Sequence, residues 1–266
     1  MIMFNTIKLR KVLTEQGYLV SDRKKNGELF LLKKIKKNFD IFLDIGFYKG
    51  EISEFVRKIN NQIKIYGFDI NNLKLNKILK LKKKNIIFYN FGVFKKNINS
   101  KYYYFTQRPE LSSLKKRSDY NPYISKNFIL KKTKLVKMTR IFKKIKILPK
   151  SKIFLKMDID GAESDILMSI KPLLKKYDIS GYFEYGTGWK NYKKKLQTLY
   201  YFLKENNYQI YRLCKNGVLE MRYFSALDEN FFQSHYFFTK KKINTIFKKK
   251  RRVVSLSSET KENFFY

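Results

Sequence analysis

One segment of the sequence has the pattern of a buried strand, a glycine-containing turn and an amphipathic helix. From Phe39 it reads FDIFLDIGFYKGEISEFVRKI, an apolar run that ends in Asp44 and is followed by Gly46 and Gly50. The apolar residues of the helix recur at helical spacing and comprise Ile52, Phe55, Val56 and Ile59. A strand that leads directly into a helix is the repeating unit of an α/β sheet, so this segment predicts a sheet covered by helices.

The turn between that strand and helix has features of a nucleoside-binding site. Gly46 would let a ligand approach the backbone, and the free N–H groups at the helix start favour polar or negative groups. The next predicted strand ends in Asp69, and an acid about 20 residues beyond a glycine turn is suitably placed for two ribose hydroxyls. The turn is not the dinucleotide fingerprint GxGxxG, because Phe47 and Tyr48 lie inside DxGxxxG. Turn and cap chemistry is the alternative explanation for Asp44 and Asp69.

A second strand-like run, 153–167, stops abruptly in closely spaced carboxylates. It reads IFLKMDIDGAESDIL and places Asp158, Asp160 and Glu163 directly after the apolar residues, with Gly161 permitting a tight turn. Ligands of α/β sheets bind beyond the carboxyl ends of the strands, which is where these acids would lie. They are therefore candidates for function. In the alternative, Asp160 or Glu163 caps the first free N–H groups of the following helix.

Three motifs of this sequence resemble those of the FkbM-type S-adenosylmethionine-dependent methyltransferases. That family carries a D-[VI]-G-x-N-x-G turn, an acid ending the second strand and a late K-x-D-[VI]-[ED]-G-A-E motif. Here these read DIGFYKG in 44–50, GFDI in 67–70 and KMDIDGAE in 156–163, and ELSSL in 110–114 is similar to a serine-containing segment of the family. The sequence departs from the pattern at Tyr48, where the family usually has Asn, and at Ile70, where Pro is frequent.

The resemblance implies a fold, a cofactor and an activity. The fold is a Rossmann-like class I methyltransferase fold, a mostly parallel seven-stranded sheet with helices on both faces. The cofactor is S-adenosyl-L-methionine, and the implied reaction is O-methylation of a hydroxyl of a sugar, a glycan or another secondary metabolite. The residues carried over as cofactor contacts are Asp44, Gly46, Tyr48, Gly50 and Asp69.

Methyl transfer requires the protein to align an acceptor hydroxyl and to accept its proton, because the sulfonium already carries the activated carbon. Asp158 and Asp160 are the leading candidates for this catalytic work, and Glu163 and Glu184 are further candidates. Trp189 and Tyr185, which follow Glu184, are either sugar-stacking surfaces or part of a core aromatic cluster, and we favour the cluster.

The net charge of +37 points to an acidic partner such as nucleic acid or an anionic membrane. The charge comes overwhelmingly from lysines spread along the whole chain, a pattern that also fits a composition bias. Arginine, which supplies most bidentate recognition of bases and phosphates, is scarce, so we disfavour specific nucleic-acid binding.

Two function classes stay open beside the O-methyltransferase. One is a nucleic-acid methyltransferase or RNA/DNA-binding protein, although DIDG occupies the slot where amino-methylating enzymes place [ND]-P-P-[FY]. The other is a non-catalytic protein with a decayed methyltransferase site, because Phe47 and Tyr48 depart from the usual turn.

The sequence divides into a cap segment at 1–38, a methyltransferase domain at 39–239 and a basic tail at 240–266 that could contact an anionic membrane. The seven strands are predicted at 39–45, 64–69, 85–91, 153–158, 179–185, 208–214 and 235–239. The cap segment contains the strand-like run LFLL from Leu29, and the insertion between the third and fourth strands contains a hairpin candidate at KYYYFTQ and a polar loop reaching Lys134. KNG from Lys215 predicts a further hairpin turn. One cysteine, no secretory signal and no long apolar run predict a cytoplasmic protein, peripheral at most to the inner membrane face. We interpret His235 as structural and predict no metal site, although three carboxylates leave Mg²⁺ open.

Overall fold

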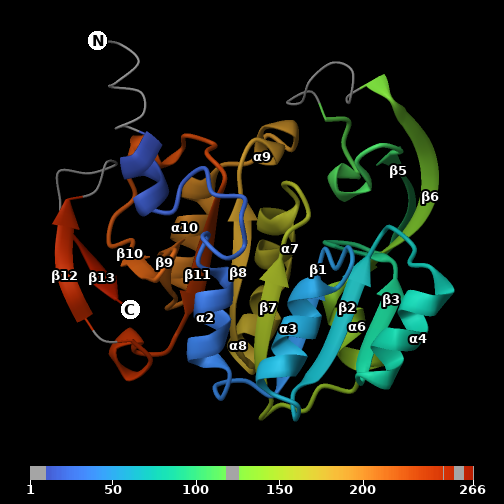
Figure 1. Cartoon of the computed structure of the whole chain (residues 1–266), viewed down its shortest axis with the longest axis horizontal. Helices are drawn as coiled ribbons and strands as arrows, with labels where there is room; N and C mark the ends of the chain where they lie inside the picture. Colours follow the sequence, from blue (N-terminus) through green and yellow to red (C-terminus); the bar gives the residue numbers. More distant parts are fainter. Residues whose placement is uncertain (1–9, 118–125, 248, 255–260, 266) are drawn as a thin grey trace.

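The computed structural model describes residues 10–117, 126–247, 249–254 and 261–265. Within these residues, the strands of a ten-stranded sheet have the order β12-β13-β10-β9-β11-β8-β7-β1-β2-β3 (Figure 1). Neighbouring parallel strands are β1 (Ile41–Ile45), β2 (Lys64–Asp69), β3 (Ile86–Asn90), β7 (Lys152–Met157) and β8 (Asp178–Tyr185). Next to them, β11 (Ser234–Thr239) runs antiparallel to both β8 and β9 (Gln209–Cys214).

These seven strands correspond to the seven predicted ones, and they confirm the Rossmann-like class I methyltransferase fold. The predicted number of strands in the sheet is too low, because β10, β12 and β13 extend it to ten through antiparallel pairs. From one edge of the sheet, β3, β2 and β1 follow one another in the reverse of their order along the chain. Beyond β1, the sheet continues with β7 and β8 in the order of the chain. The reversal between β1 and β7 is a topological switch point, the place at which open α/β sheets bind ligands.

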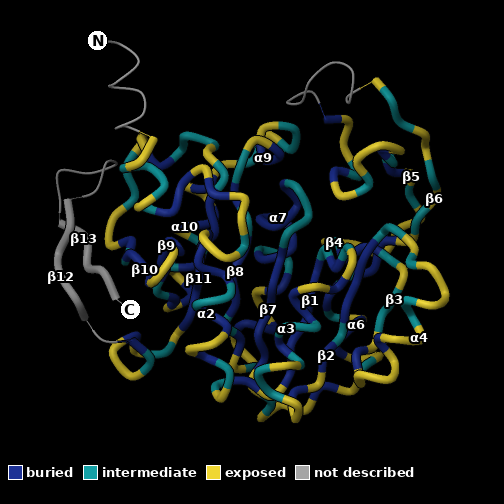
Figure 2. Tube along the Cα trace, viewed as in Figure 1, coloured by how far each residue is buried: buried dark blue, intermediate teal, exposed yellow. Residues whose placement is uncertain are grey.

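Helices cover both faces of the sheet, and each face has its own apolar core. One core contains residues of α2 (Glu28–Ile35), α3 (Glu51–Ile59) and α4 (Leu75–Lys83), packed on strand residues such as Phe42 and Phe154. The other contains residues of α6 (Met138–Lys144), α7 (Glu163–Ser169), α8 (Lys171–Lys176) and α10 (Leu196–Glu205), packed on strand residues such as Leu43 and Leu155. Every residue of β1 is therefore buried, as Figure 2 shows for the centre of the sheet.

The predicted strand-like segment at Leu29 is wrong, because these residues form the helix α2. Gly27, with a positive φ of 90°, precedes it, and Leu31, Leu32 and Ile35 are buried at helical spacing against the sheet. A short run of four apolar residues does not distinguish a strand from a buried helix. The cap segment is thus held to the sheet by a helix.

An insertion between β3 and β7 forms a second sheet with the order β4-β6-β5. The strand β5 (Ile98–Phe105) pairs antiparallel with the ten-residue β6 (Phe128–Lys137), and β6 pairs with the short β4 (Gly92–Phe94). The predicted hairpin at KYYYFTQ contributes β5, but the predicted polar loop reaching Lys134 is a strand from Phe128 onward. Between them lies the short turn η1 (Pro109–Leu111) of the ELSSL segment.

Strand β10 (Gly217–Glu220) forms the predicted hairpin with β9. The segment interpreted as a basic tail contains η3 (Ile243–Thr245), β12 (Lys249–Val254) and β13 (Lys261–Phe265), and β13 pairs with β10. Ile243 and Phe247 are buried in the α2–α3 core, so the beginning of this segment packs on the domain. No helix in the described part of the chain combines the length and the apolar character needed to cross a membrane.

Candidate active site

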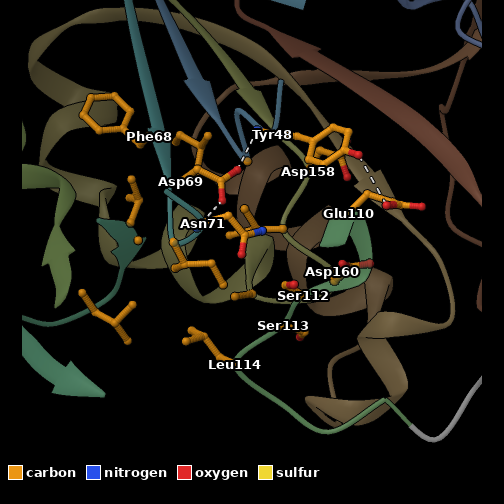
Figure 3. Close-up of a pocket in the computed structure, with 18 of the residues that line it drawn as sticks. Tyr48, Phe68, Asp69, Asn71, Glu110, Ser112, Ser113, Leu114, Asp158 and Asp160 are labelled. Atoms are coloured by element: carbon orange, nitrogen blue, oxygen red, sulfur yellow. Dashed lines mark hydrogen bonds between the residues drawn. The ribbon is translucent and has the colours of Figure 1, made fainter. Parts of the chain in front are cut away.

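A pocket opens beyond the carboxyl ends of β1, β2 and β7, at the topological switch point (Figure 3). Its walls come from the turn after β1, the end of β2, the turn after β7, the ELSSL segment and the cap segment. The lining residues include Arg23, Gly46, Tyr48, Phe68, Asp69, Ile70, Asn71, Val93, Glu110, Ser112, Ser113, Leu114, Leu135, Asp158 and Asp160. This is the edge of the sheet at which the sequence predicts the cofactor and acceptor residues.

The turn after β1 depends on two glycines with positive φ. Gly46 has a φ of 83°, and a Cβ there would lie 1.9 Å from the carbonyl oxygen of Asp158. Gly50 has a φ of 75°, and a Cβ there would lie 2.3 Å from the ring of Phe47, which is itself buried. Gly46 lines the pocket, whereas Gly50 leaves room for Phe47 beneath it. Both glycines are thus required by packing as well as by backbone conformation.

Asp69 lies where β2 ends, with both carboxylate oxygens facing backbone donors. Its Oδ2 accepts the N–H of Tyr48 at 2.6 Å and its Oδ1 accepts the N–H of Asn71 at 2.7 Å. Burial raises the pKa of Asp69 to about 6, although these two hydrogen bonds and the charge of Lys156 oppose the rise. Each oxygen keeps a second lone pair, so the carboxylate can still accept ligand hydroxyls.

Asp44 does not line the pocket but lies beneath the turn in a buried ion pair. Its Oδ1 is 3.0 Å from Nζ of Lys156, and its Oδ2 accepts the hydroxyl of Ser53 at 2.7 Å. Lys156 also donates to the carbonyl oxygen of Gly46 at 2.5 Å. Burial alone would lower the pKa of Lys156, but Asp44 and then Asp158 raise it above its usual value. The pair therefore ties the β1 turn to β7.

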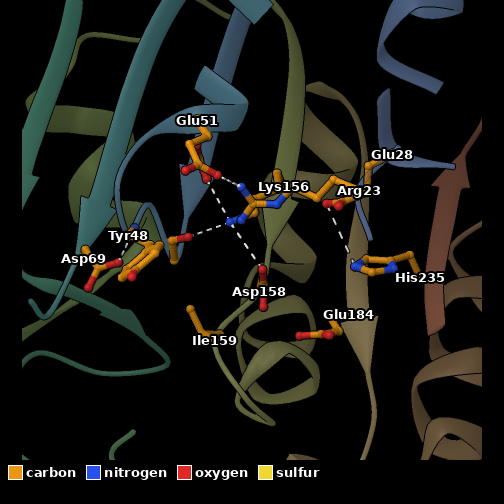
Figure 4. A network of polar contacts seen from close by, with 12 residues as sticks. Arg23, Glu28, Tyr48, Glu51, Asp69, Lys156, Asp158, Ile159, Glu184 and His235 are labelled. Atoms are coloured by element: carbon orange, nitrogen blue, oxygen red, sulfur yellow. Dashed lines mark hydrogen bonds and ion pairs between the residues drawn. The ribbon is translucent and has the colours of Figure 1, made fainter. Parts of the chain in front are cut away.

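Asp158 and Glu184 form a carboxyl pair beside the pocket (Figure 4). Burial and the negative charge of Asp158 raise the pKa of Glu184 well above its usual value, so Glu184 is the protonated partner. Burial would raise the pKa of Asp158 too, but Lys156, 3.7 Å away, and the hydrogen bond with Glu184 hold it at about 2. The side chain of Asp158 is 31% exposed and faces the pocket, while Gln233 donates to Glu184 at 2.5 Å. Asp158 is thus a charged acceptor at neutral pH.

The other two acids of the late motif are engaged differently. Asp160 pairs with Arg117 and adopts a positive φ of 59°. Glu163 is fully buried, and its oxygens accept the N–H groups of Ile159 and Gly161, each at 2.8 Å. Burial raises the pKa of Glu163 to about 8. Glu163 thus stabilises the turn before α7 and does not cap the first free N–H groups of that helix, whereas Asp160 lines the pocket.

A smaller cavity adjoins the pocket, and Asp160 lines both. Its walls also include Arg117, Glu163, Glu184, Thr187, Trp189 and Gln233. Trp189 is only 1% exposed and donates its indole N–H to the carbonyl oxygen of Glu184 at 3.0 Å, and Tyr185 is fully buried. Both aromatic residues thus belong to the core cluster that the sequence analysis favoured.

Several pocket residues were not singled out from the sequence. Arg23 comes from the cap segment, where it pairs with Glu51 at the start of α3. Asn71 follows the second-strand acid by two residues, and Ser112 lies in the ELSSL segment. Of these three residues, only Ser112 could be found from the sequence, because ELSSL resembles the serine-containing segment of the family. Arg23 comes close to Glu51 and Asp158 through the tertiary fold alone.

Two buried polar atoms at the pocket have no hydrogen-bond partner among the described residues, namely Oδ1 of Asn71 and Oγ of Ser112. The same pocket is lined by the apolar side chains of Phe68, Ile70 and Val93. An apolar slot with a few unsatisfied polar atoms suits a purine ring, with Asp69 at the ribose position. The residues present therefore fit an adenosine-containing cofactor.

His235 is buried next to Glu28, with Nε2 3.9 Å from Oε1, and it lies outside the pocket lining. Its position between the cap and β8 agrees with a structural role. Among the residues that the structure describes, no group of three or more His, Cys, Asp or Glu side chains is arranged to hold a metal ion.

Comparisons with known proteins give matches to solved structures alone, since no family model and no curated protein matches the chain. The chain is similar to an FkbM methyltransferase. That structure, from Methylobacillus flagellatus KT, is 13% identical with a TM-score of 0.44, and the match covers 76% of this chain but 44% of that one. The chain thus spans less than half of that protein.

Two further structures are similar at comparable levels. A precorrin-6y C5,15-methyltransferase from Geobacter metallireducens GS-15 is 12% identical with a TM-score of 0.39, covering 84% of this chain and 91% of that chain. A candidate methyltransferase from Streptococcus mutans, in complex with SAH, is 11% identical with a TM-score of 0.35, covering 79% and 95%. At these levels of similarity, the function of this chain has to be argued from its own site.

Proposed function

We propose that the protein is an S-adenosylmethionine-dependent O-methyltransferase that methylates a hydroxyl of a sugar, a glycan or another secondary metabolite. The observation that carries the proposal is that Asp69 and Asp158 line one pocket (Figure 3). Asp69 ends β2, and Asp158 follows β7 as a charged carboxylate. This arrangement supports a nucleoside site next to a hydrogen-bond acceptor for a substrate.

The cofactor would be held by residues of the β1 and β2 turns. Asp69 would accept the ribose hydroxyls, and Asn71 and Ser112 would supply polar atoms for the base. The backbone at Gly46 would let the amino-acid portion approach, and Arg23 would supply a positive charge for its carboxylate. Asp44 and Gly50 support this site from below, because neither lines the pocket.

The bound cofactor supplies an activated methyl group on a positively charged sulfur. Asp158 orients the acceptor hydroxyl by accepting its hydrogen bond, and the protonated Glu184 with Gln233 fixes the carboxylate in place. A carboxylate with a low pKa is a weak base. It suffices here because the acceptor oxygen becomes strongly acidic only as its new bond to carbon forms, so Asp158 takes the proton late.

Polar groups that suit a polyhydroxylated acceptor lie at the junction between the pocket and the adjoining cavity. Asp158, Asp160 and Glu184 lie there, with Asp160 paired with Arg117 and Glu184 protonated. A polyhydroxylated acceptor finds several hydrogen-bond acceptors at these carboxyl groups and donors at the amide of Gln233. Sugars and hydroxylated metabolites have this chemistry.

Isothermal titration of the full chain with S-adenosylhomocysteine and S-adenosylmethionine tests the cofactor. We expect saturable binding of both at one site. Transfer of a labelled methyl group to a panel of neutral and anionic hydroxylated compounds then tests the reaction. Absence of binding by either ligand to folded protein would overturn the proposal, and transfer confined to nucleic acid would replace the acceptor class.

A further inference from the structure

The hairpin of β5 and β6 ends in an exposed tip that combines aliphatic and basic side chains. Ile129 and Leu130 are 49% and 54% exposed, although both are large apolar residues. Lys126 before them and Lys132 after them are exposed as well. We call these four residues, together with Lys131, the hairpin tip. Because successive side chains of a strand face opposite sides, Ile129 and Leu130 give both faces of this end of β6 an exposed aliphatic group, which favours contact with a partner that surrounds the tip.

The charge around the hairpin tip is one-sided. Between Leu111 and Met157 the sequence contains a single acidic residue, Asp119, while lysines recur throughout. The exposed lysines near the tip include Lys115, Lys116, Lys126, Lys132 and Lys134. Lys131 lies over the ring of Tyr104, 3.4 Å from its centroid, so its aliphatic stem follows the strand. The partner of this surface therefore has to be anionic.

The combination of features distinguishes between anionic partners. Single-stranded nucleic acid is bound by lysines interleaved with exposed aromatic rings. In the hairpin the rings are buried, as in Tyr102 and Phe105, or half-buried, as in Tyr103, Tyr104 and Phe128, whereas its exposed large apolar side chains are aliphatic. Aliphatic side chains flanked by lysines instead suit the boundary between lipid headgroups and acyl chains, where apolar groups insert and lysines contact anionic headgroups.

We propose that the hairpin tip docks the protein on an anionic lipid membrane by inserting Ile129 and Leu130 at the headgroup boundary. The hairpin rises at the upper right of Figure 1, on the side to which the parallel strands point and on which the pocket opens. Docking in this way turns the carboxyl edge of the sheet toward the membrane. The binding itself does not depend on methyl transfer.

Cosedimentation with vesicles tests this docking. The full chain is mixed with vesicles of phosphatidylcholine alone or with about one third phosphatidylglycerol, and we expect retention only by the latter, decreasing as salt rises. The double variant I129S/L130S should lose at least about tenfold in partition. The matched control is Leu227→Ser, because Leu227 is 65% exposed but stands beside Asp228 and Glu229, and its partition should not change.

Two further measurements distinguish docking through the hairpin tip from docking through the basic cluster at 248–252 and from nucleic-acid binding. Alanine in place of residues 248–252, the KKKRR cluster, should reduce partition modestly at low salt, since it removes charge without removing the apolar anchor. If that variant alone abolishes retention while I129S/L130S binds like the wild type, the hairpin tip is not the membrane contact. If vesicles never retain the wild type, the proposal fails, whether or not polyuridylic acid binds the protein.

A further variant tests docking by a fluorescence signal that changes on binding, and so does not rely on the loss of vesicle binding. In Leu130→Trp, the new indole reports on the tip, since the native Trp189 is 1% exposed and far from solvent. We expect a blue shift of the added emission and quenching by brominated lipid only with anionic vesicles. Thermal melting of every variant verifies the fold. Emission unchanged by anionic vesicles that do retain the protein would overturn the proposal.

Discussion

The pKa of Asp69 leads to a pH dependence that tests the ribose site directly. Burial raises this pKa to about 6, and the carboxylate is the acceptor for the ribose hydroxyls in our proposal. The folded protein without cofactor therefore binds a proton at Asp69 as pH falls through about 6. Because the protonated form has lost part of its acceptor capacity, cofactor affinity should be full above this pKa and decline below it.

The size of the effect follows from the titration. With a pKa of about 6, Asp69 is almost fully ionised at pH 7.5 and only about one tenth ionised at pH 5. If only the ionised form binds, the Kd for S-adenosylhomocysteine should rise about tenfold between these pH values. Isothermal titration at both values, in buffers of equal ionic strength, measures it.

The matched variants are Asp69→Asn and Asp69→Ala. Removal of the charged acceptor should weaken binding by about tenfold to a hundredfold at pH 7.5, on the order of 1.5 to 3 kcal/mol. The residual affinity of Asp69→Asn should then be independent of pH over the same range. This variant is therefore the control for the titration of other groups such as Glu163. A wild-type Kd that does not change between pH 5 and 7.5, or an Asp69→Ala variant with undiminished affinity, would refute the ribose assignment.

Three substitutions test the rest of the site. Asp158→Asn should lower the methyl-transfer rate by about 100-fold or more while melting temperature and cofactor Kd hold, and an active variant would move attention to Glu184. Gly46→Ala should unfold or strongly destabilise the protein in thermal melts, because its Cβ would lie 1.9 Å from a carbonyl oxygen, whereas Gly186→Ala, with nothing within 3.5 Å, should be tolerated. Lys156→Met should cost about 3–5 kcal/mol in denaturant unfolding, with partial recovery on adding Asp44→Asn, since the single change leaves a buried carboxylate unpaired.

The sheet was predictable from the sequence because its strands are buried on both faces. β1 and β7 each contain the apolar run IFL, and the helix after β1 has a clear apolar stripe. Short runs gave less information. LFLL fits a strand and a buried helix equally well, and only its packing against the α3 core decided for a helix.

The contacts that build the site were less accessible to prediction, because they join residues far apart in the chain. Asp44 and Lys156 are separated by 112 positions and meet only because β1 and β7 are neighbours. The pair of Asp158 and Glu184 likewise depends on β7 lying beside β8. The motif predicted which residue types gather at the sheet edge, but it did not tell which of them line the pocket and which support it from below.

That division of roles bears on whether the site has decayed. Tyr48, the main departure from the family pattern, contacts Asp69 through its backbone N–H, and any residue able to adopt its positive φ of 48° supplies the same donor. The Tyr48 side chain instead points toward Glu110, with its hydroxyl 3.4 Å from the carboxylate. Phe47 lies beneath Gly50 and outside the pocket. Neither change removes a group that holds the carboxylate of Asp69 in place, so the sequence departures alone are no evidence for an inactive protein.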